Sequence, residues 1–309
     1  MTAKAPLNNK RPFRLLAGIS QLGDLADGNV AYGDFGMGNV YYVNGGSDGP
    51  TASGAAGDKE HPFQTIKEAL AVCTSGNDDY IIVLNYGSNG RGAEDWPILV
   101  TKDQVHIIGA RATPASKWAT VKPDEADSAF EVTGVRCEFA NLEIGGYSTG
   151  SGIELTGNNW GTWIHDCWFG YTGDTAGTNG IFADTGIDAA YTLVENCIFG
   201  ESLTGDGIKI VTNCTRSIIK NNLFHRIAGI AVNLAGNVVG VQVLGNRFDM
   251  AAQTAGDAIT LGATASACHV ADNHANYGKT TDTTKYWVSA GSGVAFGYNM
   301  VNGVLLQPS

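Results

Sequence analysis

The residues that could do chemistry in this 309-residue chain are carboxylates with arginines in the same part of the sequence. Hydrolysis of a glycosidic bond needs two carboxyl groups about 5–9.5 Å apart, and an elimination needs a base beside acidic groups that hold Ca²⁺. No two candidate carboxylates recur at one position of the sequence repeat, as a pair on neighbouring turns would. We therefore assign no catalytic residue and leave enzymatic activity open. The candidates are Asp166, Asp184, Asp188, Glu195 and Asp206, with Arg216 and Arg226 as cations.

The cysteines and histidines of the chain do not form a metal-site pattern. No C-x-x-C pair occurs, and the histidines are scattered singly. The segment 44–48, NGGSD, has oxygen ligands that suit Ca²⁺, although a plain turn is the simpler interpretation. Cys167 and Cys197 share one repeat position, and stacked strands lie close enough for a disulfide, but we favour buried free thiols. The sequence therefore predicts no metal and no cofactor.

A four-residue motif recurs six times between residues 141 and 275 and sets the fold. The last positions of successive copies lie 25, 30, 25, 24 and 27 residues apart. A period in the twenties, built of short β-prone runs and Gly, Asn or Asp turns, is typical of a solenoid in which each repeat is one coil. The copies are 141–144, 166–169, 196–199, 221–224, 245–248 and 272–275. A second signature, Gly or Ala before a branched residue, occurs at 152–153, 180–181, 207–208, 229–230, 258–259 and 293–294.

Counting each coil from the last residue of the motif as position zero separates inward from outward side chains. Position −5 is apolar in every coil, from Phe139 to Val270, so it is expected to face inward. The change of parity between −5 and −2 requires a bend near −3, where Asn, Asp and Gly tolerate the left-handed backbone. At position −2, Asn222, Asn246 and Asn273 are then expected to stack as a ladder of side-chain amides.

Positions −6, −4 and −1 are expected to face outward. At −4, the charges of His165, Glu195 and Lys220 predict an ion-pair ladder on neighbouring strands. At −6 and −1, three consecutive coils carry large apolar side chains, which we expect on one outer face as a patch that a soluble monomer seldom exposes. The patch predicts an oligomer contact; the alternative is a local loop that covers it, for which residues 171–179 are available. The six residues are Trp163, Trp168, Leu193, Ile198, Ile218 and Leu223.

The first part of the chain has no repeat but contains predictable elements. Apolar residues follow the helical period from Pro62 to Cys73, and a proline suits the first turn of a helix. Coils are expected from about residue 129. The elements expected before them are strands at 40–43, 81–84 and 105–108 and the helix at 62–73.

Two of these early segments resemble a known fold family. Residues 40–49, VYYVNGGSDG, and 61–70, HPFQTIKEAL, resemble the opening of right-handed parallel β-helices of the pectate-lyase-like superfamily. The resemblance implies an all-β, single-stranded right-handed parallel β-helix over 40–309, capped by the short helix at 62–73. The superfamily includes lyases, hydrolases, adhesins and inert virion parts, so it implies no single activity. Because phage spikes of this fold are usually trimers, it also implies a homotrimer.

A further resemblance concerns the leading segment. Residues 11–22, RPFRLLAGISQL, look like the N-terminus of a tailed-phage virion protein, which implies an extended anchoring arm over 1–39. Residues 1–14 carry a net charge of +4 and the remainder −15, out of a formal −11. That sign disfavours nucleic acid, and no apolar run reaches the 18 residues of a membrane span. The expected anchoring residues are Lys10, Arg11, Phe13, Arg14, Leu15, Leu16 and Ile19.

The combined expectation is a structural virion surface protein of a tailed bacteriophage, either a capsid decoration or a short spike. Its partners would be two further copies of itself and other capsid or tail proteins, which the arm contacts. It would reside on the virion surface after assembly in the host cytoplasm. The alternative is a tailspike that binds or depolymerises a host surface polysaccharide as a lyase or hydrolase. A bacterial β-helical adhesin is a third interpretation, which the lack of an export-signal pattern disfavours.

Overall fold

The computed structural model describes residues 38–45, 57–85, 94–110, 119–123, 126–145, 149–170, 177–250, 258–276, 287–289 and 293–306. The seven residues assigned to the anchoring arm, from Lys10 to Ile19, lie outside the described residues, as does most of the 44–48 turn. The division into an arm and a β-helix domain at residue 39 therefore stays a prediction.

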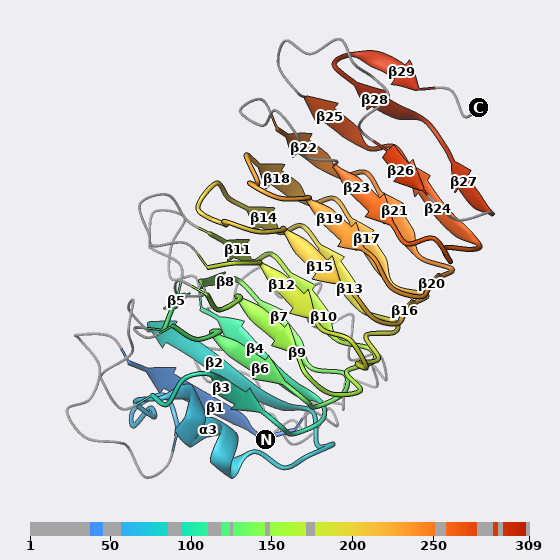
Figure 1. Ribbon diagram of the computed structural model, residues 1–309. Helices are drawn as coiled ribbons and strands as arrows, with labels where there is room; N and C mark the ends of the chain where they lie inside the picture. Colours follow the sequence, from blue (N-terminus) through green and yellow to red (C-terminus); the bar gives the residue numbers. More distant parts are fainter. Residues whose placement is uncertain are drawn as a thin grey trace, which may run out of the picture.

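Three parallel sheets, here called A, B and C, run along the length of the molecule (Figure 1). Sheet A consists of β1 (Val40–Asn44), β2 (Asp79–Asn85), β4 (Val105–Gly109), β7 (Glu138–Ala140), β10 (Trp163–His165), β13 (Leu193–Glu195), β17 (Ile218–Lys220), β21 (Gln242–Leu244), β24 (Cys268–Ala271) and β27 (Val294–Phe296). Sheet B consists of β3 (Ile98–Val100), β6 (Phe130–Val132), β9 (Ile153–Leu155), β12 (Ile181–Ala183), β15 (Ile208–Ile210), β19 (Val232–Leu234), β23 (Ile259–Leu261) and β26 (Trp287–Ser289). Sheet C consists of β5 (Ala119–Val121), β8 (Leu142–Ile144), β11 (Trp168–Phe169), β14 (Ile198–Phe199), β18 (Leu223–His225), β22 (Arg247–Asp249), β25 (His274–Asn276), β28 (Asn299–Val301) and β29 (Val304–Leu306).

From β4 onward, each coil passes through sheet A, then sheet C, then sheet B, and returns to sheet A one strand further along. A small fourth sheet, β16 (Cys214–Thr215) with β20 (Val238–Val239), lies between the B and A strands of two coils. These pairings confirm the predicted all-β, right-handed parallel β-helix. The coils begin earlier than the predicted residue 129, because β2, β3 and β5 already pair in parallel with the following coil. Their loops differ in length, which hides the repeat in the sequence.

The predicted bend at position −3 has the expected left-handed backbone. Asn141, Asp166, Asn196 and Asn221 have φ between 51° and 57°, and Gly245 has φ of 62°. A second left-handed column, which the sequence did not predict, lies at position −8, before each strand of sheet A. Its residues include types that rarely adopt this conformation. They are Arg136, Gly161, Tyr191, Arg216, Gly240 and Ala267.

The core is a column of phenylalanines with parallel rings. The centroids of Phe169 and Phe199 are 4.9 Å apart, those of Phe199 and Phe224 4.7 Å, and those of Phe224 and Phe248 5.0 Å. The glycine of the second signature makes room for this column, since a Cβ at Gly180 would lie 2.6 Å from the Phe199 ring. Phenylalanine rings thus explain the glycines at the start of these sheet B strands.

Two members of that second signature were assigned wrongly. Strand pairing aligns Ile208 with Val232, so the fourth member is 231–232 and not 229–230. The segment 293–294 belongs to another sheet, because Val294 pairs with Cys268 in sheet A. Both errors arise because Gly followed by a branched residue also occurs in turns.

The side chains at position −2 form a continuous interior ladder. Asn222 Nδ2 donates to Asn246 Oδ1 at 3.0 Å, Asn246 to Asn273 at 3.0 Å, and Asn273 to Asn299 at 3.0 Å, so the ladder is one residue longer than predicted. The amides also donate to backbone carbonyls of the preceding coil, as Asn246 does to Ile219. All four amides are therefore buried with their polar atoms paired.

Cysteines take the place of asparagine in the two coils before the ladder. Cys167 Sγ donates to the Phe139 carbonyl at 3.5 Å and Cys197 Sγ to the Ile164 carbonyl at 3.7 Å, which are the carbonyl positions that the asparagine amides use in later coils. All six cysteines are buried free thiols, including Cys167 and Cys197, for which free thiols were favoured over a disulfide. Burial raises the pKa of Cys197 far above its ordinary value, because a thiolate there would be desolvated.

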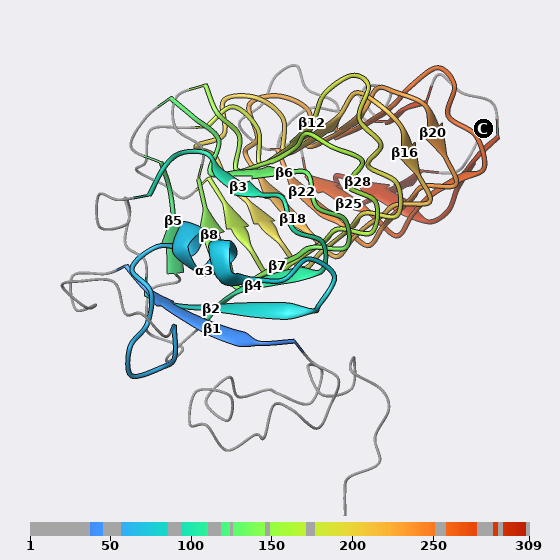
Figure 2. The ribbon, with the colours of Figure 1, turned by 90° about the horizontal axis from the view of Figure 1, so that it is seen from below.

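Both ends of the stack are closed. Helix α3 (Ile66–Val72) lies across the N-terminal end (Figure 2) and begins later than predicted, because Thr65 is extended and caps the helix in a capping box with Glu68. Phe63 instead forms a bridge with Val43. At the other end, β29 turns back and pairs antiparallel with β28, which ends the parallel stack. The predicted helix start at Pro62 is thus wrong.

Candidate functional site

The six residues predicted to form an oligomer contact all point outward and are half-buried. They lie in two rows, which we call the apolar rows, and not on one outer face as predicted. Strand register places one row on sheet A and the other on sheet C, because the left-handed bend at position −3 turns the chain between them. The sheet A row is Trp163, Leu193 and Ile218, and the sheet C row is Trp168, Ile198 and Leu223.

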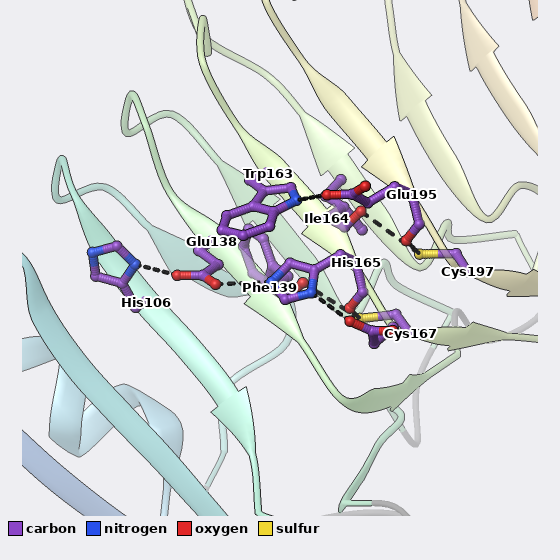
Figure 3. A network of polar contacts seen from close by, with 10 residues as sticks. His106, Glu138, Phe139, Trp163, Ile164, His165, Cys167, Glu195 and Cys197 are labelled. Atoms are coloured by element: carbon purple, nitrogen blue, oxygen red, sulfur yellow. Dashed lines mark hydrogen bonds and ion pairs between the residues drawn. The ribbon is translucent and has the colours of Figure 1, made fainter. Parts of the chain in front are cut away.

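Trp163 also belongs to a polar network on the outer face of sheet A (Figure 3). Its indole stacks on the His165 ring, with the centroids 4.0 Å apart, and its Nε1 donates to Glu195 Oε1 at 3.0 Å. Lys220 Nζ lies 2.9 Å from Glu195 Oε2. The predicted ion-pair ladder therefore exists between Glu195 and Lys220, whereas His165 pairs with other carboxylates.

Glu138 is the centre of this network. Its Oε2 is 2.5 Å from His106 Nδ1 and its Oε1 is 2.8 Å from His165 Nε2, while His165 Nδ1 is 2.7 Å from Asp166 Oδ2 (Figure 3). The Glu138 side chain is only 4% exposed. Tyr80 stacks on His106 with the ring centroids 4.3 Å apart, which shields the group further.

Burial disfavours the charged forms of Glu138 and His165, whereas their hydrogen bonds and ion pairs favour these forms. Burial would raise the pKa of Glu138, but hydrogen bonds and charges from His106 and His165 outweigh it and lower that pKa to about 2. Burial would lower the pKa of His165, but its bonds to Asp166 and Glu138 raise it to about 9. Near neutral pH a glutamate anion and an imidazolium face each other. The network therefore joins three neighbouring coils of sheet A by charge-assisted hydrogen bonds, and we call it the Glu138 staple.

The carboxylates singled out in the sequence are not brought together. Asp206 accepts hydrogen bonds from the Ile230 backbone and from Asn233, and Arg226 pairs with Glu201 at 2.9 Å. Arg216 donates to the Tyr191 hydroxyl at 2.8 Å. The remaining candidates make local contacts to backbone or to neighbours already described; they are Asp166, Asp184, Asp188 and Glu195.

A carboxylate pair that the sequence analysis missed lies on the outer face of sheet B. Glu131 and Glu154 are direct partners on neighbouring strands. Glu154 Oε2 accepts a hydrogen bond from Ser128 Oγ at 2.8 Å. Two strands further along the same row, Lys209 Nζ lies 5.9 Å from the centroid of the Phe182 ring. Glu154 follows the 152–153 copy of the second signature, but Glu131 follows Ala129 and Phe130, which that signature did not include.

A pocket of about 540 Å³ opens beside sheet C near the C-terminal end. Arg247, His274 and Met300 line it from one outward row, since Arg247 pairs with His274 and His274 with Met300 on consecutive strands. Asn276 and Asn302 also line it. The described lining of the pocket thus combines cationic, amide and thioether groups and includes no acidic side chain.

Within the part of the chain that the structure describes, no His, Cys, Asp or Glu side chains group in threes so as to hold a metal ion. A search for helices of membrane-spanning length and apolarity, made over those same residues, finds none.

No protein-family model matches the chain, and no curated protein matches it. Among solved structures, three chains match. One is the pectate lyase Pel9A, with 13% identity and a TM-score of 0.45 over 86% of this chain and 77% of the lyase. Another is a glycosyl hydrolase candidate from Parabacteroides merdae, with 10% identity and a TM-score of 0.32 over 66% of this chain and 84% of that chain. The strand pairing of this chain itself shows that it is a parallel β-helix.

Proposed function

We propose that this protein is a structural rod on the surface of a tailed-phage virion, a capsid decoration or short spike that assembles as a homotrimer. The observation that carries the proposal is the pair of apolar rows, in which large side chains face out of the coil on three consecutive turns. Burying such surface between copies contributes about 25 cal/mol per Å². Coil formation does not require apolar side chains at these outward positions, whereas burial in a contact between copies would favour them.

The interior supports a mechanical role for the coils. Four stacked phenylalanines and four hydrogen-bonded asparagines tie each turn to the next along the axis. The Glu138 staple adds charge-assisted hydrogen bonds across three turns of sheet A. A coil stack linked in this way resists local opening, which suits a projecting and protease-resistant element.

The anchoring part of the proposal rests on the leading segment, whose net charge is +4 while the rest of the chain is −15. A variant that lacks residues 1–38 is expected to keep the circular dichroism spectrum of the coils and to be absent from purified particles. A matched variant, with Phe13, Leu15 and Leu16 replaced by Ser in the full-length chain, separates apolar from electrostatic docking. Particles that carry the truncated protein at the wild-type level would refute the anchor.

A second candidate function is cleavage of a host surface polysaccharide, and one observation favours it. Glu131 and Glu154 are paired carboxylates on an outer face that also presents Phe182 and Lys209. Two carboxyl groups about 5–5.5 Å apart suit a retaining glycosidase. Wild-type protein would then release reducing ends from capsular polysaccharide, Glu154→Gln would abolish the release, and Glu143→Gln on sheet C would not. A wild-type protein that releases none removes this candidate.

A further inference from the structure

The pocket beside sheet C begins where the sheet C apolar row ends, because Arg247 pairs with Leu223 on the preceding strand, and it is distinct from the sheet B carboxylates. Its floor is the outward row Arg247, His274 and Met300 on strands β22, β25 and β28. Position −1 of the three preceding coils is apolar, whereas Arg247 and His274 occupy the same position here and are exposed. Along this outward row of sheet C, apolar side chains are thus replaced by Arg247 and His274. The change indicates that the surface of the C-terminal coils has a different function.

Several cationic side chains of the described residues have a carboxylate partner. Lys220 pairs with Glu195, Arg226 with Glu201, and His225 with Asp249, the last on the same strand as Arg247. The Arg247 and His274 side chains make no hydrogen bond or ion pair within the described part of the chain. Arg247 is thus a cationic group without a described carboxylate partner in a chain of net charge −11.

Arg247 and His274 are partners on neighbouring strands, which places their side chains next to each other. Residues directly opposite each other on neighbouring strands have Cβ atoms about 4.5–5.5 Å apart, so both side chains can reach one ligand group. The guanidinium is a planar fork that matches carboxylate and phosphate oxygens bidentately, and an imidazole at one strand spacing is placed to donate to the same group.

We propose that this pocket binds a small ligand that bears a carboxylate or phosphate group. Arg247 holds two oxygens of the anion, His274 donates to the same group, and the uncharged body of the ligand lies against Met300. A volume of about 540 Å³ is in the range of small-molecule sites. The site shares no residue with the apolar rows, although Arg247 is the strand neighbour of Leu223.

Isothermal titration calorimetry of the full-length chain tests the site with three matched probes: glucuronate, glucose 6-phosphate and glucose. We expect binding of glucuronate or glucose 6-phosphate and none of glucose; the stronger of the two acidic probes shows whether carboxylate or phosphate is preferred. Arg247→Gln is expected to weaken binding at least about tenfold, because a charge-assisted hydrogen-bond pair is lost. Arg247→Lys, which keeps the charge and loses the fork, is expected to lie between wild type and Arg247→Gln.

Arg226→Gln is the matched control, since it removes an arginine of the same sheet that is already paired with Glu201. It should bind the acidic probe as the wild type does. The proposal is overturned if neither acidic probe binds at millimolar concentration, or if a folded Arg247→Gln protein keeps wild-type affinity. Light scattering of Arg247→Gln should give the wild-type mass, so that a failure of this site and a failure of assembly are told apart.

Discussion

The middle coils and the C-terminal coils share one interior but differ on the outside. The phenylalanine column and the position −2 hydrogen bonds run through both regions. Outward positions −6 and −1 are apolar in the middle coils, for example Leu193 and Ile198, and become Gln242 and Arg247 further along. A parallel β-helix thus fixes its inward residues by coil geometry, while the outward residues of each coil are free to serve a separate purpose.

Asn246→Leu tests whether the shared interior depends on the amide ladder. The substitution removes bonds to Asn273 and Ile219 and leaves donors of Asn222 unpaired. Each buried unsatisfied group costs about 1–3 kcal/mol, so we expect the free energy of unfolding in urea to fall by roughly 4 kcal/mol. Thr260→Val is the control, because the Thr260 hydroxyl has no described partner. An Asn246→Leu protein as stable as wild type would show that the ladder contributes little.

Glu138→Gln tests whether the outer charges of sheet A are structural. The Glu138 pKa falls from 4.5 to about 2 on folding, so its contribution is full above pH 4.5 and is lost as the pH falls towards 2. The His165 pKa rises from 6.5 to about 9, so its contribution is full below pH 6.5 and is lost as the pH rises through 9. Stability should therefore be greatest between about pH 4.5 and 6.5.

In that window Glu138→Gln should lower the free energy of unfolding by roughly 3 kcal/mol, because a buried ion pair loses one partner. The variant should also show a flatter dependence on pH in urea denaturation. Glu131→Gln makes the same chemical change on sheet B, at a carboxylate without a described partner, and should change stability little. Equal losses in the two variants would contradict the structural role of Glu138.

Cys197→Ala measures how much a thiol at position −2 contributes to stability, for comparison with the amide of Asn246. It removes a weak Sγ–H bond to the Ile164 carbonyl and leaves a small gap, so a loss of about 1 kcal/mol in unfolding free energy is expected. The measurement is the same urea titration, read beside Asn246→Leu. A loss as large as that of Asn246→Leu would mean that thiols and amides at position −2 stabilise the coil stack equally.

The sequence predicted the architecture because inward positions obey strict geometry. Asn, Asp and Gly at position −3 and apolar residues at −5 were sufficient to find the coils. The second bend, at position −8, escaped because Arg136, Tyr191 and Arg216 do not favour a left-handed backbone. There the fold imposes a conformation that the residue types do not indicate.

The side-chain groups on the outer faces were harder to predict, because they depend on the strand register between neighbouring coils. Glu131 and Glu154 became partners only once loop lengths were known, and the misplaced 229–230 signature shows how a short loop shifts the register. The Glu138 staple joins residues 32 and 27 apart in sequence through particular side-chain orientations. A repeat search over 141–275 could not include His106, whose strand precedes the recognisable copies.

The most direct test of the proposed assembly is the mass of the full-length protein in solution, measured by light scattering. We expect three times the 32.3 kDa of one chain for the wild type and for the control Gln242→Lys, which adds the same charge at the next position of the sheet A row. Leu193→Lys with Ile218→Lys should give the mass of one chain, because two ammonium groups cannot be buried in the contact. A wild-type protein that is monomeric, or a double variant that keeps the trimer mass, would contradict the account.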